Sequence, residues 1–150
     1  MLNFAARPEV PYHPLMSTPP VLMPVKTAEL PAPVGPYSPA VIAGNLVFVS
    51  GQAGRDPKTG QLAADVEGQT EQTLKNVAAI LEAAGSGLDH VVKATVYVAD
   101  LAHWPAFNAI YGETFGAHRP ARTVVPVATL HYGYLVEMDV IAALKDPTGS

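Results

Sequence analysis

Three polar side chains occupy positions where a polar residue needs an explanation. Arg122 opens an apolar run, residues 123–125, and Glu137 stands inside another, residues 135–138. Tyr37 lies in a proline-flanked segment between the predicted N-terminal region and the first predicted strand. A guanidinium can hold a carboxylate, a carboxylate can handle a water, and a phenol can pack against a flat ligand. These types would suit a reaction of water with a small carboxylic acid.

Arg122 has two interpretations. An arginine at the border of a β core needs a partner, because an unpaired buried guanidinium is very costly. The partner is either a protein carboxylate, in a structural ion pair, or the carboxylate of a substrate held by two parallel hydrogen bonds. Spacing alone does not choose between the two.

Glu137 and Tyr37 also have more than one interpretation. Glu137 is a residue of a solvent-facing edge, an ion-pair partner of Arg122, or a partly buried carboxylate whose pKa suits it to handle a water. Tyr37 either packs as an ordinary loop tyrosine or presents its hydroxyl and ring to a small ligand.

Several kinds of site are disfavoured by what the sequence lacks. The glycine-rich nucleotide-binding motifs and the HExxH and GxSxG motifs are missing. The absence of cysteine excludes disulfides, a thiol nucleophile and thiolate metal sites. The five histidines show no metal-ligand spacing. We therefore expect no metal and no cofactor.

Composition indicates one globular domain. The chain has 150 residues, of which 49% are hydrophobic, and this is enough for a buried core. The net charge is −4 and no stretch concentrates Lys or Arg, so a nucleic-acid partner is not expected. No apolar run reaches the roughly 18 residues of a membrane span. The N-terminus lacks the pattern of a secretory signal, so we expect a cytoplasmic protein.

Hydrophobic periodicity predicts strands and helices after residue 34. The Gly44-Asn45 pair is expected to join two short strands, and Asp65 to cap a helix that ends near Ala84. Asp100 is expected to cap a second helix that ends near Phe115. The predicted strands, in the order ββαβαββ, cover residues 41–42, 46–50, 91–98, 122–128 and 134–144.

The ends of the chain differ from this regular part. Nine of the 15 prolines lie within the first 36 residues, so residues 1–33 are predicted to form a Pro-rich N-terminal arm, either loose or packed on a neighbouring subunit. Residues 34–145 would form the domain, and residues 146–150 a C-terminal tail. The last strand has apolar residues on both faces, which usually means that both faces are buried. Two helices on one side would cover only one face, so we expect oligomerisation to cover the other.

A series of segments resembles the RidA/YjgF family, in the order in which that family has them. GPYSPA at residues 35–40 looks like the family's opening signature, and VFVSGQ at residues 47–52 is similar to its second strand. Asn76, residues 92–98 and Asp100 also fit the family pattern.

The closing block is the most specific part of the resemblance. It contains RPART at residues 119–123, and Glu137 in a Val-Glu-hydrophobic-acidic strand. The resemblance covers about residues 34–144. It implies an α+β fold of the chorismate-mutase type, a mixed sheet with two helices on one face. It also implies a barrel-type homotrimer with a site at each subunit interface.

The resemblance further implies hydrolysis of small carboxylated enamines and imines of the 2-aminoacrylate type, which releases ammonia and a 2-keto acid. It assigns carboxylate binding to Arg122, a position beside the attacking water to Glu137, and packing against the substrate to Tyr37, as the three catalytic residues. No cofactor is implied. The expected substrate-binding residues are Arg122, Tyr37, Asn108, Gly51, Thr123 and Val124.

Departures from the family pattern bear on the substrate. Pro39 replaces a frequent Gln, Val124 stands where many members have Cys, and residues 129–134 replace the usual Leu-Pro-Lys type of turn. Because the turn is altered, an alternative function is also possible: deamination of a 2-aminomuconate-type acid in aromatic degradation. A non-catalytic regulatory module that binds a small carboxylate is also open. An RNA-cleaving activity, attached to some family members, is disfavoured by the net negative charge.

Overall fold

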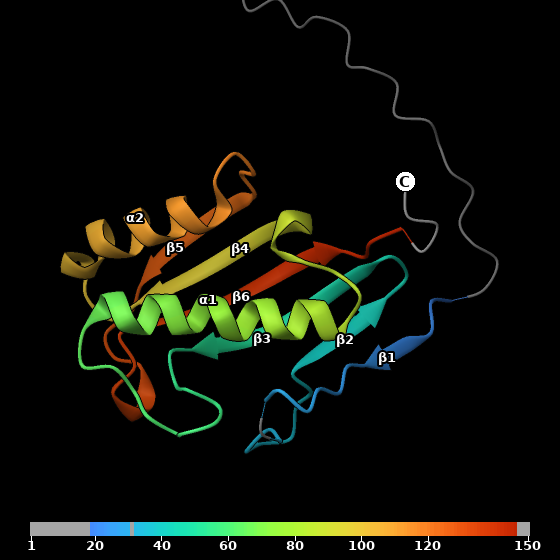
Figure 1. Ribbon diagram of the computed structural model, residues 1–150, viewed down its shortest axis with the longest axis horizontal. Coiled ribbons are helices and arrows are strands. Elements are labelled where there is room, and N and C mark those ends of the chain that lie inside the picture. Colours follow the sequence, from blue (N-terminus) through green and yellow to red (C-terminus); the bar gives the residue numbers. More distant parts are fainter. Residues whose placement is uncertain (1–18, 31, 147–150) are drawn as a thin grey trace, which may run out of the picture.

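The computed structural model describes residues 19–30 and 32–146, which form a six-stranded sheet with two helices on one face (Figure 1). The helices are α1 (Val66–Ala83) and α2 (Trp104–Phe115), accompanied by the 3₁₀ turns η1 (Leu88–His90), η2 (Leu101–His103) and η3 (His131–Gly133). The strands are β1 (Leu22–Pro24), β2 (Ala40–Ala43), β3 (Leu46–Ala53), β4 (Val91–Val98), β5 (Ala121–Pro126) and β6 (Val136–Ala143).

The predicted α+β class and the ββαβαββ order are confirmed for the part from β2 to β6. The sheet order is β1-β2-β3-β6-β4-β5, which places β6 between β3 and β4. The strands pair antiparallel except for β4 and β5, which are parallel. A parallel pair needs a long crossover, and η2 and α2 provide it.

One strand lies inside the segment that was predicted to be an arm. β1 pairs with β2, and the backbone N–H of Val25 donates to the carbonyl of Ala40 at 2.8 Å. The Val25 side chain is buried in the core. The surrounding prolines are the reason that the sequence does not predict this strand. Proline is nevertheless tolerated on an edge strand, because one side of such a strand needs no hydrogen bonds. Residues 1–18 and 31 of the predicted arm, and residues 147–150 of the predicted tail, lie outside the described residues.

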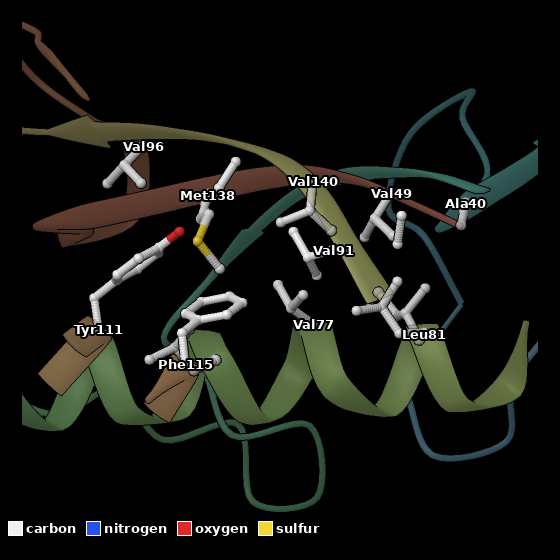
Figure 2. Close-up of a cluster of buried hydrophobic side chains, with 14 of the residues drawn as sticks. Ala40, Val49, Val77, Leu81, Val91, Val96, Tyr111, Phe115, Met138 and Val140 are labelled. Carbon is white, nitrogen blue, oxygen red and sulfur yellow. The ribbon is translucent and has the colours of Figure 1, made fainter. Parts of the chain in front are cut away.

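The core fills the space between the two helices and one face of the sheet (Figure 2). Asp65 caps α1 as predicted, since its carboxylate accepts a hydrogen bond from the Gly68 N–H at 2.7 Å. Figure 2 shows Leu81 of α1 and Phe115 of α2 pointing toward the same face of the sheet. The predicted apolar stripe of α1 is buried throughout: Val66, Thr70, Leu74, Val77, Leu81 and Ala84.

The central strand β6 is buried on one face only. Val136, Met138, Val140 and Ala142 are buried beneath the helices, whereas the alternate residues of the strand are partly exposed. The expectation that both faces are buried is therefore not met within one chain. Neither α-helix of the described part of the chain is long and apolar enough to cross a membrane.

Candidate functional site

The strand register separates Arg122 from Glu137. Arg122 lies opposite Ala94 of β4, and Glu137 lies opposite Tyr97 of the same strand. Ala94 is buried beneath the helices, whereas Tyr97 is three residues away and projects from the other face. Directly paired residues share a face, so Arg122 and Glu137 lie on opposite faces of the sheet.

Glu137 faces a cavity of about 660 Å³ at one end of the β3–β6 pair. The register of this pair shifts between Val49 and Gln52, and the bulge brings Gly51 against the Glu137 side chain. A Cβ atom on residue 51 would overlap the Oε1 of Glu137, so the position requires glycine for the carboxylate to lie where it does. The residues that line the cavity include Tyr37, Ser50, Gly51, Arg55, Tyr134 and Glu137.

The electrostatics of the cavity favour the neutral form of Glu137. Burial raises the pKa of the Glu137 carboxyl above its ordinary value, and the nearby Asp139 raises it further, while His131 opposes the shift. A carboxylate with a raised pKa is a stronger base than an exposed one. The side chain is still only partly buried, so a water or a small ligand can reach it.

Tyr37 reaches the same cavity from the loop before β2. The Tyr37 N–H donates to the Gly35 carbonyl at 2.9 Å, which closes a tight turn. Ser50 of β3 holds this loop, because its hydroxyl donates to the Ser38 carbonyl at 2.6 Å and its N–H donates to the Pro39 carbonyl at 2.9 Å. Tyr37 remains 52% exposed, so its ring and hydroxyl are available to a ligand.

Two polar residues of α1 fix the loops that frame the cavity. The Asn76 amide donates to the carbonyls of Ala53 and Arg55, both at 2.9 Å. The Gln69 side chain accepts from the Leu135 N–H at 2.8 Å, just before β6 begins. The end of β3 and the start of β6 are thus tied to the same helix. Asn76 is one of the residues that fit the family pattern, and its structural role is to hold the Ala53 and Arg55 carbonyls.

Arg122 lies on the helix side, beside a second cavity of about 390 Å³. Its Nη2 donates to the Oδ1 of Asn108 at 2.9 Å, and its guanidinium lies over the rings of Trp104 (5.0 Å) and Tyr111 (4.6 Å). Within the described residues no carboxylate lies within 4.0 Å of it. The interpretation of Arg122 and Glu137 as an ion pair of one chain is therefore wrong.

The predicted site residues thus fall into three groups. The first cavity brings together Tyr37, Gly51 and Glu137, and the second brings together Arg122 and Asn108. Thr123 and Val124 line neither of these two cavities. Thr123 lies opposite Thr95 on the open face of the sheet, and Val124 packs against the core.

Several residues of the first cavity were missed by sequence reasoning. Ser50 lies in the VFVSGQ segment, where the resemblance assigns it no role, and Arg55 carries no signal because it belongs to no motif. The segment 129–134, which departs from the family pattern, contributes His131, Tyr132 and Tyr134 to the lining of the cavity. Across residues 19–30 and 32–146, no three His, Asp or Glu side chains gather as they would around a metal ion.

A family model described as Endoribonuclease L-PSP matches residues 27–144. The chain belongs to the RidA/YjgF family. A relative within it, Reactive Intermediate Deaminase A, chloroplastic, of Arabidopsis thaliana, is 46% identical over 121 residues, which are 80% of this chain and 65% of that protein. The 2-iminobutanoate/2-iminopropanoate deaminase of Capra hircus is 43% identical over 119 residues, 79% of this chain and 87% of that protein.

A solved structure of the RidA/YjgF family has the same fold. The crystal structure of the YjgF gene product from E. coli superposes with a TM-score of 0.78 at 41% sequence identity. The match covers 82% of this chain and 99% of that one. The family relatives named as deaminases support imine deamination as an activity of the family to which this chain belongs.

Proposed function

We propose that the chain hydrolyses small carboxylated imines and their enamine tautomers, of the 2-aminoacrylate type, to ammonia and a 2-keto acid. The observation that carries the proposal is the partly buried Glu137 carboxylate, which faces the same cavity as Tyr37. Two relatives named as deaminases of such compounds support it.

The chemistry requires water and proton transfers only. The enamine first becomes the imine by moving a proton to its terminal carbon. Glu137 then takes a proton from a water as the water oxygen bonds to the imine carbon, and the nitrogen gains a proton. In the resulting carbinolamine the hydroxyl proton passes to the nitrogen as the C–N bond breaks, so ammonia leaves and a carbonyl remains. Tyr37 packs against the flat substrate, and positioning supplies much of the rate because the uncatalysed reaction is already easy.

Arg122 completes the site from a neighbouring subunit in this proposal. Within one chain it lies on the opposite face of the sheet from Glu137. In a homotrimer, Arg122 of the partner subunit would close the cavity and hold the substrate carboxylate by a two-pronged contact. The open face of the sheet supports such an assembly, because Phe48 is 43% exposed there and lies opposite the partly buried Ile141.

The test is release of ammonia from 2-iminobutanoate generated in place by an amino-acid oxidase. Semicarbazide traps the imine that remains, so an active deaminase lowers the yield of semicarbazone. We expect the wild type to lower it and Glu137→Gln to behave like buffer. A wild type that accelerates hydrolysis of neither 2-iminobutanoate nor 2-iminopropanoate would refute the proposed function.

A further inference from the structure

We propose that Arg55 forms a second anion-binding subsite, so that the preferred substrates are 2-imino acids with another carboxylate at the far end of the side chain. This inference rests on the proposed function and names its substrate class. It assigns the first carboxylate to Arg122 of the partner subunit and the distal one to Arg55.

Arg55 and Glu137 stand at the same end of the β3–β6 pair. Ala53 is the register partner of Glu137, and Arg55 follows two residues later. β3 ends at Ala53 and the chain bends at Gly54, so Arg55 lies at most about 7 Å farther along the backbone. That is the scale of a short carbon chain between an imine carbon and a distal carboxylate. Both residues line the same cavity.

The Arg55 guanidinium is held in place by two hydrogen bonds. Its Nη1 donates to the Gly60 carbonyl at 2.6 Å, and its Nε donates to the Tyr134 hydroxyl at 3.3 Å. Its Cζ also lies 5.7 Å from the centre of the Tyr134 ring. A guanidinium carries five N–H donors, so these contacts orient the group and leave donors for a carboxylate.

Within the described residues, no carboxylate oxygen lies within 4.0 Å of the Arg55 guanidinium nitrogens. The neighbouring Asp56 also lines the cavity, but its Oδ1 accepts from the N–H groups of Lys58 (2.7 Å) and Thr59 (3.0 Å). These hydrogen bonds lower the pKa of Asp56 and keep it within its own turn. Glu137 repels anions from the other end, so Arg55 provides attraction where a second negative charge would otherwise be rejected.

The wall beside Arg55 is large and aromatic. His131, Tyr132 and Tyr134 contact one another edge to face, with ring centres 4.7–5.9 Å apart. Tyr132 has a φ of 59°, a left-handed conformation that is rare for a tyrosine, and its side chain is 67% exposed at the cavity. A cavity of about 660 Å³ with this wall has room for a longer substrate than a four-carbon imino acid.

The decisive measurement is a ratio of specificities. The value of kcat/KM is determined for 2-iminoglutarate and for 2-iminobutanoate, each generated in place from its amino acid by an oxidase. We expect the wild type to prefer the dicarboxylic imine, and Arg55→Met to lower the preference at least tenfold, mainly through KM. Arg55→Lys should retain part of it. Lys58→Met is the matched control, because Lys58 is an exposed cation of the same turn and does not line the cavity.

The outcomes separate this inference from the proposed function. If the wild type is active and Arg55→Met leaves the ratio unchanged, the distal subsite is refuted while the deaminase stands. If Arg55→Met lowers both values of kcat/KM equally, Arg55 holds the first carboxylate instead, which also refutes it. If the wild type is inactive on both imines, the deaminase fails. The subsite is then tested by calorimetry, which measures the binding affinities for 2-oxoglutarate and 2-oxobutanoate. A smaller preference for 2-oxoglutarate in Arg55→Met than in the wild type supports the subsite, and an unchanged preference refutes it.

Discussion

At the scale of single residues, Glu137 combines two opposing properties. In the proposed reaction it is ionised when it accepts a proton from water, yet its surroundings raise its pKa and so shift it toward the protonated form. A carboxyl whose pKa is raised by folding stabilises the fold fully below its unfolded pKa, and this contribution is lost as pH rises through the folded pKa. The base role proposed for Glu137 therefore comes with a lower stability of the folded protein at neutral pH than at low pH.

We expect Glu137→Gln to change both the activity and the pH dependence of stability. We expect the accelerated reaction to fall by about 100-fold or more, as for loss of a general base. Gln cannot ionise, so the variant should gain stability relative to the wild type as pH rises from 4 to 7, measured by urea unfolding at each pH. Glu82→Gln, at an exposed position of α1, is the control. A stability difference that does not change with pH would contradict the shifted pKa.

The activity of the wild type should increase with pH, since the ionised form of Glu137 is the proposed base. The value of kcat/KM should rise with pH along a limb whose midpoint lies above the ordinary carboxyl value, because the ionised form is the base. A pH–rate profile on 2-iminobutanoate measures it. A midpoint at or below the ordinary value would argue against Glu137 as the base.

Arg122 should not tolerate replacement by lysine. We expect Arg122→Lys to lower kcat/KM at least about tenfold, or roughly 1.4 kcal/mol, because an ammonium is a point charge that makes no two-pronged contact. Arg122→Ala should abolish acceleration. Thermal unfolding is the control, since the contacts with Asn108, Trp104 and Tyr111 also contribute to packing. A folded and fully active Arg122→Ala would remove this residue from the site.

At the scale of elements, two nearby glycines in the β3 region have different reasons to be glycine. A Cβ on Gly51 meets the end of the flexible Glu137 side chain, which can turn away. A Cβ on Gly54 would lie 2.5 Å from the backbone oxygen of Gln69, and α1 cannot yield without losing its packing. One glycine therefore serves the site and the other the fold.

The matched pair Gly51→Ala and Gly54→Ala tests this division. We expect Gly51→Ala to keep a melting temperature near that of the wild type while kcat/KM falls about tenfold or more, because the base is displaced. Gly54→Ala should instead be destabilised by about 1–3 kcal/mol, as for overpacking. Thermal melts and the ammonia assay on both proteins give the comparison. Equal losses of stability in the two variants would contradict it.

The elements themselves were largely predictable because their signals are local. The Asp65 cap, the apolar stripe of α1 and the apolar runs of β3 and β6 each arise from neighbouring residues, and the structure has the cap, the stripe and both strands. β1 was missed because three residues on a proline-rich edge carry no alternation and depend on β2 for their pairing. Arg55 was missed because its importance comes from the loop after β3 meeting the turn before β6, which no local pattern shows.

At the scale of the whole molecule, residue types were easier to predict than their arrangement. Arg122, Glu137 and Tyr37 were each recognisable from their motifs. That Arg122 and Glu137 lie on opposite faces depends on the register of β4 with both β5 and β6, which is a long-range property. The ion pair proposed as an alternative was plausible in sequence and impossible once that register is known.

The assembly can be measured directly. We expect light scattering at micromolar concentration to give about three times the chain mass of 15.7 kDa, because the open face of the sheet needs cover and the proposed site needs a partner. Activity should fall on dilution into the range where trimers dissociate. A stable monomer that is fully active would overturn both the trimer and the shared site.

In the proposed trimer, the placement of Arg122 and Glu137 on opposite faces of the sheet has a genetic consequence. A chain without Arg122 and a chain without Glu137 would each be inactive alone, yet together they would form interfaces at which an intact arginine meets an intact glutamate. With equal amounts mixed at random, about one quarter of the interfaces would have both groups. Two defective alleles would then complement each other in one cell, and the unit on which selection acts would be the contact between chains rather than the chain.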